Sequence, residues 1–251
     1  MASRVTDYIE QIRSVASLLR SDEIEWAYDL LDDARRTGRG VYIFGNGGSA
    51  STASHLAADL GKNICTGPMP RMHVVSLTDN VPWLTALAND NDYADCFAGQ
   101  LRNYLRPGDV VIGVSASGDS ENVVRAFQLA QKRGAHRLAL IGFDGGRLAA
   151  LASRRIWIDS HDYGIVESLH LVVAHLLVQM LSEGSQSAAG PVEEREPAQD
   201  SVTHVAACRL SDPPLTASWA SPAARPMRRM PQTRPAAVSF KLPFQKRRYP
   251  T

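Results

Sequence analysis

The sequence has little cysteine, almost no net charge and no long hydrophobic run, and each absence argues against a class of protein. Three cysteines in 251 residues, at positions 65, 96 and 208, form no motif, which is typical of a reduced protein of the cytoplasm. A formal net charge of +1 gives no global field that would attract nucleic acid or a membrane surface. No segment reaches about 18 consecutive apolar residues, so no membrane span is predicted.

The C-terminal part of the chain differs in composition from the rest. Ten of the fourteen prolines lie beyond residue 184, where ten Lys or Arg residues stand against five Asp or Glu residues. Such a segment buries too little apolar surface to offset the entropy of ordering it, so residues 184–251 are predicted to be a disordered tail. Residues 1–183 are predicted to form the folded domain.

Apolar runs alternate with segments of helical periodicity after residue 40. The runs predict strands at 41–44, 72–77, 109–114, 137–142 and 155–158, and the later periodic segments predict helices at 92–105, 120–133, 147–153 and 164–181. Nearly all-apolar strands joined by helices indicate an α/β fold, with a doubly wound five-stranded parallel sheet of the flavodoxin-like kind. Ligands of such sheets bind beyond the carboxyl ends of the strands.

Two amphipathic helices are predicted before the first strand, at 5–19 and 21–36, as an N-terminal helical extension. Ser21 and Asp22 offer an N-cap for the second helix, and Gly38 ends it. The two helices have little sheet to cover by themselves. They are expected either to pack on another subunit or to cap their own sheet.

The stretch 41–60 has the pattern of a strand, a glycine turn and a helix. The turn Gly45-Asn46-Gly47-Gly48-Ser49, here called the glycine loop, lets backbone N–H groups approach an anion at the positive end of the helix. Its spacing matches neither the P-loop nor the G-x-G-x-x-G fingerprint, so a nucleotide is not indicated. We interpret the loop as a phosphate cradle, and a tight turn without a ligand is the alternative.

A second candidate loop follows the strand at 109–114. This serine loop, Ser115-Ala116-Ser117-Gly118-Asp119-Ser120, places three hydroxyls at the start of another helix. Ser120 is a plausible N-cap, but capping accounts for one serine and not for three. Hydroxyl and backbone donors without Lys or Arg suit a phosphate monoester that binds reversibly, such as a sugar phosphate.

Several side chains could act as acids, bases or metal ligands. His55 and Asp59 stand at i and i+4, on one face of the helix after the glycine loop. His175 lies in an apolar helix, where an ionisable side chain is costly without a partner. His170 has the same pattern, and either histidine could be a hydrogen-bonded core residue. Glu167 stands about 12 Å from His175 along a regular helix. Both can bind one ion only if Glu167 lies on an irregular first turn of that helix or reaches across an interface.

Taken together, these motifs resemble a known family. The glycine loop, His55, Asn89-Asp90, the serine loop and the helix with Glu167 and His175 are similar to the phosphoheptose (sedoheptulose 7-phosphate) isomerases of the SIS, or sugar isomerase, fold. The resemblance covers residues 1–183. It implies that the serine loop holds the phosphate, with Ala116 in place of the usual threonine. The substrate-binding residues that it implies are Asn46, Gly47, Ser49, Asn89, Asp90, Ser115, Ala116, Ser117, Ser120 and Glu167.

The resemblance also implies a divalent metal at His55, Asp59, Glu167 and His175, with Asp59 and His175 as the catalytic residues. Asp59 stands where the family usually has glutamate, and Glu167 where it has glutamine. Two imidazoles and two carboxylates suit Zn²⁺, which is the expected ion, and they also accept Mn²⁺ or Fe²⁺. No organic cofactor is expected.

The implied reaction is an aldose–ketose isomerisation through an enediol, from sedoheptulose 7-phosphate to D-glycero-D-manno-heptose 7-phosphate. His175 or Asp59 would be the base, and the metal a Lewis acid. The implied assembly is a homotetramer with active sites at its interfaces.

Three alternatives stay open at this point. One is a non-catalytic phosphosugar-binding protein, such as one that interacts with the replication initiator DnaA. Another is an isomerase of a different phosphosugar. The third is a phosphosugar-sensing regulator, for which the sequence shows no DNA-binding element.

Overall fold

The computed structural model describes residues 2–64 and 69–187. The chain divides into two units, Met1–Arg195 and Glu196–Thr251, and the described residues all belong to the first. The last described helix continues to Ser187, past the domain boundary expected after residue 183. The rest of the predicted disordered tail, together with Cys65 and Cys208, lies outside the described residues.

Five parallel strands form one sheet in the order β2-β1-β3-β4-β5. Val41 of β1 lies opposite Val74 of β2 on one side and Val110 of β3 on the other, so the register is continuous across the centre of the sheet. This arrangement confirms the predicted doubly wound α/β sheet. The strands are β1 (Gly40–Gly45), β2 (His73–Ser76), β3 (Val110–Ser115), β4 (His136–Ile141) and β5 (Arg154–Trp157).

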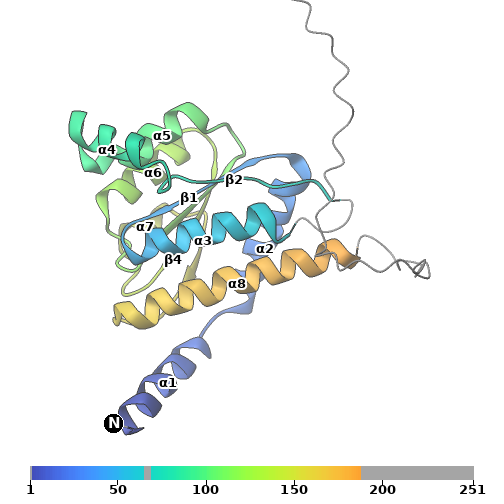
Figure 1. Cartoon of the computed structure of the whole chain (residues 1–251), viewed down its shortest axis with the longest axis vertical. Coiled ribbons are helices and arrows are strands. Elements are labelled where there is room, and N and C mark those ends of the chain that lie inside the picture. Colours follow the sequence, from blue (N-terminus) through green and yellow to red (C-terminus); the bar gives the residue numbers. More distant parts are fainter. Residues whose placement is uncertain (1, 65–68, 188–251) are drawn as a thin grey trace, which may run out of the picture. The chain divides into compact units, whose positions relative to one another are not determined.

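Helices cover both faces of this sheet (Figure 1). They are α1 (Ala2–Ala16), α2 (Ser21–Thr37), α3 (Gly48–Lys62), α4 (Val81–Asp90), α5 (Cys96–Tyr104), α6 (Glu121–Lys132), α7 (Gly146–Leu151) and α8 (Tyr163–Ser187), with a 3₁₀ turn η1 (Tyr93–Asp95).

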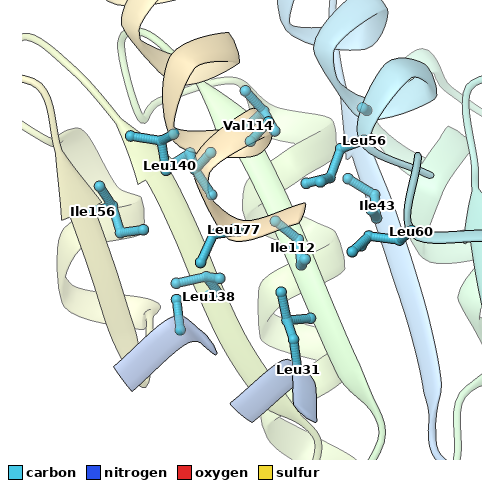
Figure 2. Close-up of a cluster of buried hydrophobic side chains, with 14 of the residues drawn as sticks. Leu31, Ile43, Leu56, Leu60, Ile112, Val114, Leu138, Leu140, Ile156 and Leu177 are labelled. Carbon is cyan, nitrogen blue, oxygen red and sulfur yellow. The ribbon is translucent and has the colours of Figure 1, made fainter. Parts of the chain in front are cut away.

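Two apolar clusters hold the helices to the sheet. On one face, Leu31 of α2, Leu56 of α3 and Leu177 of α8 meet the strands, as Figure 2 shows. Ile43 points into this cluster, whereas its neighbour Phe44 points into the cluster on the other face. Both faces of each central strand are therefore buried, which explains why the strands read as nearly continuous apolar runs. Each fully buried side chain of this size contributes about 1.5–3 kcal/mol to folding.

Helix α8 is long and apolar enough, over Tyr163–Gly184, to cross a membrane by length and composition, and half of its most apolar stretch is buried inside the protein. Leu169, Val173 and Leu177 of this helix belong to the first apolar cluster. A helix with one apolar face packed on a sheet has the pattern of a core helix.

Three local expectations differ from the structure. No helix is predicted at 81–90, where the structure has α4; none of its residues is buried, and Asn80 caps it by accepting a hydrogen bond from the Trp83 amide. The helix expected at 92–105 is divided, since Asp92 caps the short η1 turn before α5 begins. Ser21 is the first helical residue of α2 rather than its N-cap, a position that Arg20 occupies.

Candidate active site

The glycine loop joins β1 to α3 at the carboxyl edge of the sheet. Gly47 has φ of +53°, a left-handed backbone that glycine adopts without strain. The Ala50 amide donates to the carbonyls of Asn46 and Gly47, so α3 begins directly after the turn. The Ser49 side chain is buried at this helix start. The arrangement is that of a helix N-terminus, which favours an anionic ligand.

Asn46 is held by two side chains that the sequence analysis does not single out. Its amide exchanges two hydrogen bonds with the amide of Asn122, at 2.9 and 2.8 Å, and its Oδ1 also accepts from the Tyr93 hydroxyl at 2.8 Å. These three residues, with Ser120 and Arg125, line a cavity of about 470 Å³. Asn122 follows the serine loop by two residues, a spacing that could have identified it, but no sequence pattern points to Tyr93.

The serine loop lies beside the glycine loop, because it follows β3, the neighbour of β1. Ser115 Oγ accepts from the Gly118 amide at 3.1 Å, and Ser117 Oγ accepts from the Asp119 amide at 3.3 Å. Both hydroxyls are fixed in this way while their own hydrogens remain able to donate. Ser120 occupies the N-cap position of α6 without a side-chain cap bond. The predicted cap position is correct, and the hydroxyl is not used by the cap.

We expect Gly118→Ala to weaken sugar-phosphate binding. Gly118 has φ of +70°, and a Cβ there would collide with the carbonyl oxygen of Gly145. The loop must shift to relieve this contact, which moves the hydroxyls assigned to the phosphate, and a displacement of about 1 Å in an active site can lower the reaction rate about 10²-fold. Gly38→Ala is the matched control, because Gly38 has φ of +67° and open space around it. Titration of both variants with a sugar phosphate should show the loss for Gly118→Ala alone. Equal affinities would contradict the assignment of this loop.

His55, Asp59 and His175 form a trio where α3 and α8 pack side by side (Figure 1). His55 Nε2 lies 3.2 Å from Asp59 Oδ2 and 3.1 Å from His175 Nε2. Asp59 Oδ1 accepts a hydrogen bond of 2.7 Å from Asn63 Nδ2, which fixes the orientation of the carboxylate. In the described part of the chain, these are the three residues whose ligand atoms all lie within 4.8 Å of one another.

The trio has the donor set and spacing of a divalent metal site. Ligand atoms bound at about 2.0–2.2 Å to a tetrahedral ion stand about 3.4 Å apart, and the measured separations from His55 Nε2 are 3.1 and 3.2 Å. Two imidazoles and a carboxylate leave one position of a tetrahedral ion open for substrate or water. Without an ion, the two imidazoles can share a proton, one N–H donating to the other nitrogen.

Glu167 is not a member of this trio. Its carboxylate lies over Gly48, where a Cβ would collide with it, and it lines a cavity of about 280 Å³ that also includes His55 and Ser51. Helix α8 is continuous from Tyr163, so no irregular turn brings Glu167 to His175 within one chain. Glu167 and His55 share a cavity, and the role of Glu167 as a metal ligand or sugar ligand stays a prediction.

The two histidines of α8 differ in their surroundings. His170 is fully buried, and neither of its ring nitrogens has a hydrogen-bond partner. Burial lowers the pKa of His170 from 6.5 to about 4, while the nearby Ile141 carbonyl, outside hydrogen-bonding geometry, opposes this shift. His170 is therefore the core histidine, and His175 belongs to the trio.

Asn89 and Asp90 lie at the C-terminal end of α4. Both side chains are exposed, and Asn89 Nδ2 donates to Asp90 Oδ1 at 2.8 Å. The structure places them on a different element from the glycine loop, the serine loop and the trio. Their contact with a sugar stays a prediction.

The fold and these loops define a class of protein. Two turns at helix N-termini stand on neighbouring parallel strands, and His55 shares a cavity with the first residue of α3. This combination suits a domain that takes an anionic ligand at the edge of an α/β sheet and carries acid–base groups beside it.

Comparison with known proteins gives the family. The SIS domain family matches residues 6–142. A protein of Thermoplasma acidophilum named as a probable phosphoheptose isomerase is 34% identical over 176 residues, which cover 70% of this chain and 96% of that protein. The phosphoheptose isomerase of Geotalea daltonii is 33% identical over 183 residues, covering 72% and 93%. The structure of a phosphoheptose isomerase from Neisseria gonorrhoeae matches with a TM-score of 0.67 and 27% identity, covering 72% and 98%. The chain belongs to the SIS domain family and, within it, to the phosphoheptose isomerases.

Proposed function

We propose that this sugar-phosphate isomerase converts sedoheptulose 7-phosphate into D-glycero-D-manno-heptose 7-phosphate. The observation that carries the proposal is the trio of acid–base groups in which His55 Nε2 lies 3.1 Å from His175 Nε2 and 3.2 Å from Asp59 Oδ2. Its relatives are named for a phosphoheptose, which supports the choice of substrate.

In this proposal the two loops hold the substrate at opposite ends. Ser115, Ser117 and Ser120, helped by the amides of Ala116 and Gly118, bind the phosphate, and Asn46, Gly47 and Ser49 bind the sugar. The hydrogen bonds that already fix the serine hydroxyls and Asn46 reduce the reorganisation on binding. Binding energy from the phosphate, remote from the reacting carbons, then positions the carbonyl end for reaction.

The isomerisation moves one proton between neighbouring carbons. Asp59 or His175, through an atom that does not hold the ion, takes the proton from the carbon beside the carbonyl and returns it to the former carbonyl carbon, while the partner group relays the hydroxyl proton. His55 Nε2 lies 3.1 Å from His175 Nε2 and 3.2 Å from Asp59 Oδ2, so the three groups stand close enough to act on the same part of a substrate. Proton transfer of this kind contributes about 10²–10⁴-fold to the rate.

A divalent ion, Zn²⁺, would be held by His55, Asp59 and His175, with Glu167 as a further ligand. When bound it supplies a Lewis acid for the oxyanion that develops at the substrate carbonyl. We expect protein purified without chelator to contain about one divalent ion per chain, as three protein ligands predict. Elemental analysis of this protein and of His55→Ala measures it, and an ion content that His55→Ala does not change would contradict the site.

The function is tested by assaying several ketose phosphates with and without chelator. We expect turnover of sedoheptulose 7-phosphate above that of the other sugars, and loss of turnover with chelator that restored Zn²⁺ reverses. Faster turnover of another ketose phosphate would reassign the substrate. Binding without turnover of any sugar, together with capture of DnaA, would reassign the chain as a binding protein.

We further propose a homotetramer of the cytoplasm with active sites at its interfaces. Val5 and Ile9 of α1 are 67% and 56% exposed, and Val172 and Leu176, on either side of His175, are 50% and 38% exposed. Apolar side chains in these positions, including ones beside the trio, suit coverage by another copy of the chain. Light scattering should give the mass of four chains, and Ile9→Asp should lower both the mass and the turnover. A wild-type monomer with full turnover would contradict this assembly.

A further inference from the structure

One carboxylate lies inside the loop that is assigned to the phosphate, and another follows it directly. Asp119 lies inside the serine loop, and Glu121 is the first residue of α6. Hydrogen bonds from the backbone and then the side chain of Arg147 lower the pKa of Asp119, and side-chain hydrogen bonds from Arg147 and then Arg125 lower the pKa of Glu121. Both groups are therefore ionised near neutral pH. Residues 115–120 contain no Lys or Arg, so a phosphate dianion would meet like charge there unless another residue offsets it.

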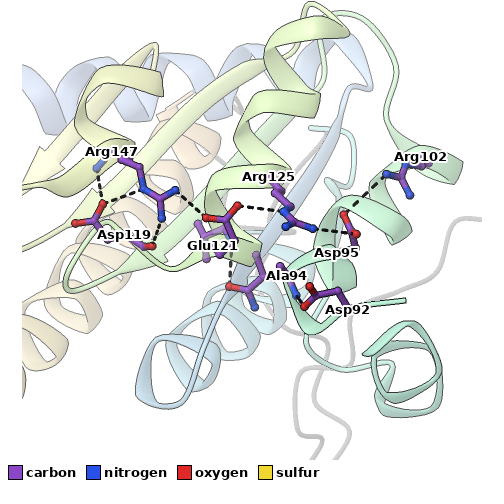
Figure 3. Close-up of polar contacts among 10 residues, drawn as sticks. Asp92, Ala94, Asp95, Arg102, Asp119, Glu121, Arg125 and Arg147 are labelled. Atoms are coloured by element: carbon purple, nitrogen blue, oxygen red, sulfur yellow. Dashed lines mark hydrogen bonds and ion pairs between the residues drawn. The ribbon is translucent and has the colours of Figure 1, made fainter. Parts of the chain in front are cut away.

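Arg147 of α7 contacts both carboxylates, as Figure 3 shows. Its backbone N–H and its Nε donate to Asp119 Oδ1 at 3.0 and 3.2 Å, and its Nη2 donates to the Asp119 carbonyl at 2.6 Å. Its Nη1 donates to Glu121 Oε2 at 2.7 Å. One guanidinium thus holds the backbone of the serine loop and offsets both of its carboxylates.

The ion-pair network extends from Glu121 to the η1 turn, which supports the glycine loop. Arg125 donates to the other oxygen of Glu121 at 3.1 Å and to Asp95 Oδ2 at 3.1 Å (Figure 3). Asp95 ends the η1 turn that begins with Tyr93, whose hydroxyl donates to Asn46. The ion pairs therefore connect the serine loop with the residue that orients Asn46.

Folding stability alone is a weak reason for such a network. The side chains of Arg147, Asp119 and Glu121 are 50%, 55% and 48% exposed. Exposed ion pairs contribute only about 0–1 kcal/mol to stability. The bond from Arg147 to the Asp119 carbonyl instead constrains the loop that is assigned to the phosphate.

We propose that Arg147 is a positioning residue for the substrate phosphate: it holds the serine loop through Asp119 and neutralises Asp119 and Glu121, so that the loop accepts a dianion. This inference rests on the proposed function, because it assumes that the phosphate binds at residues 115–120. Helix α7, which carries Arg147, would therefore contribute to substrate affinity in addition to the glycine and serine loops.

The test compares Arg147→Met with the same substitution in an Asp119→Asn/Glu121→Gln background. We expect Arg147→Met to raise KM for the sugar phosphate about tenfold or more and to change kcat less than about threefold, because a weaker phosphate site acts mainly on binding. In the neutralised background, the effect of Arg147→Met on KM should be smaller than in the wild-type background, since the repulsion is absent and only the support of the loop backbone is lost. Arg36→Met, which removes another exposed ion pair, with Asp32, is the control and should leave KM unchanged.

Salt dependence separates this role from a purely structural one. The ratio of KM between Arg147→Met and the wild type should shrink as ionic strength rises from about 0.01 to 0.5 M, because screening weakens the exposed carboxylates. An unchanged KM, or a ratio that neither salt nor the neutralised background reduces, would overturn the proposal. A wild-type protein that neither binds nor turns over a sugar phosphate would instead overturn the proposed function.

Discussion

Replacing His175 with alanine is expected to lower turnover by about 10³-fold or more, because a general base contributes up to about 10⁴-fold. The sugar phosphate should still bind, since its phosphate is assigned to a loop on another element. His175 Nε2 lies 3.1 Å from His55 Nε2, so the variant also removes the proton partner of the second imidazole. Initial rates and a separate titration with the sugar phosphate measure the two effects.

The matched control for this experiment is Gln179→Ala, one turn further along α8. Gln179 bonds to Glu183 and not to the trio, so its loss should leave turnover within about twofold, as for other surface substitutions. Unchanged turnover in His175→Ala would reject its role as a base or proton partner. Equal losses of turnover and binding would assign His175 to substrate binding instead.

The second large effect is expected in stability at acid pH, and His170 is its cause. The pKa of this buried imidazole is about 4 in the folded protein against 6.5 when it is unperturbed. Between these values the unfolded chain binds a proton that the folded protein does not bind. The free energy of unfolding therefore falls as pH drops from about 6.5 to 4, by about 3 kcal/mol in total, and this contribution is complete above pH 6.5.

Denaturant unfolding of the wild type and of His170→Leu across this pH range tests the effect. Leucine cannot titrate and leaves no unpaired ring nitrogen, so the variant should lose less stability on acidification than the wild type does. His170→Gln provides a second variant without a titrating group if leucine does not fit the site. His161→Leu, at a side chain that is 66% exposed, controls for the loss of a surface imidazole. Parallel pH profiles for the wild type and both His170 variants would contradict the assignment.

The fold was open to prediction because its strands are buried on both faces. Ile43 and Phe44 are neighbours in β1 and enter different apolar clusters, so the strand has to be apolar throughout. That pattern, with helices between the strands, indicates a parallel sheet. Helix α4 is not among the predicted helices, although Val81, Leu84 and Ala88 stand at helical spacing, and it is a short helix that buries no residue.

Local spacing predicts contacts between side chains that lie close together in the chain. His55 and Asp59 follow from helical spacing, and their side chains are in contact. His170 and His175 stand about 140° apart around the same helix, so they lie on different faces of it. Helical spacing does not say which of the two faces meets α3. The face of α8 that meets α3 decides that His175 joins the trio and that His170 is buried.

The amino-acid sequence by itself determined the α/β class, the glycine and serine turns between strands and helices, and the pair of His55 and Asp59, since each depends on residues a few positions apart. Only the tertiary structure decided which side chains support those loops. Arg147 reaches Asp119 across 28 residues, Tyr93 reaches Asn46 across 47, and Asn122 reaches Asn46 across 76. Such contacts depend on the order of the strands in the sheet, which brings distant loops to one edge and which no local pattern encodes.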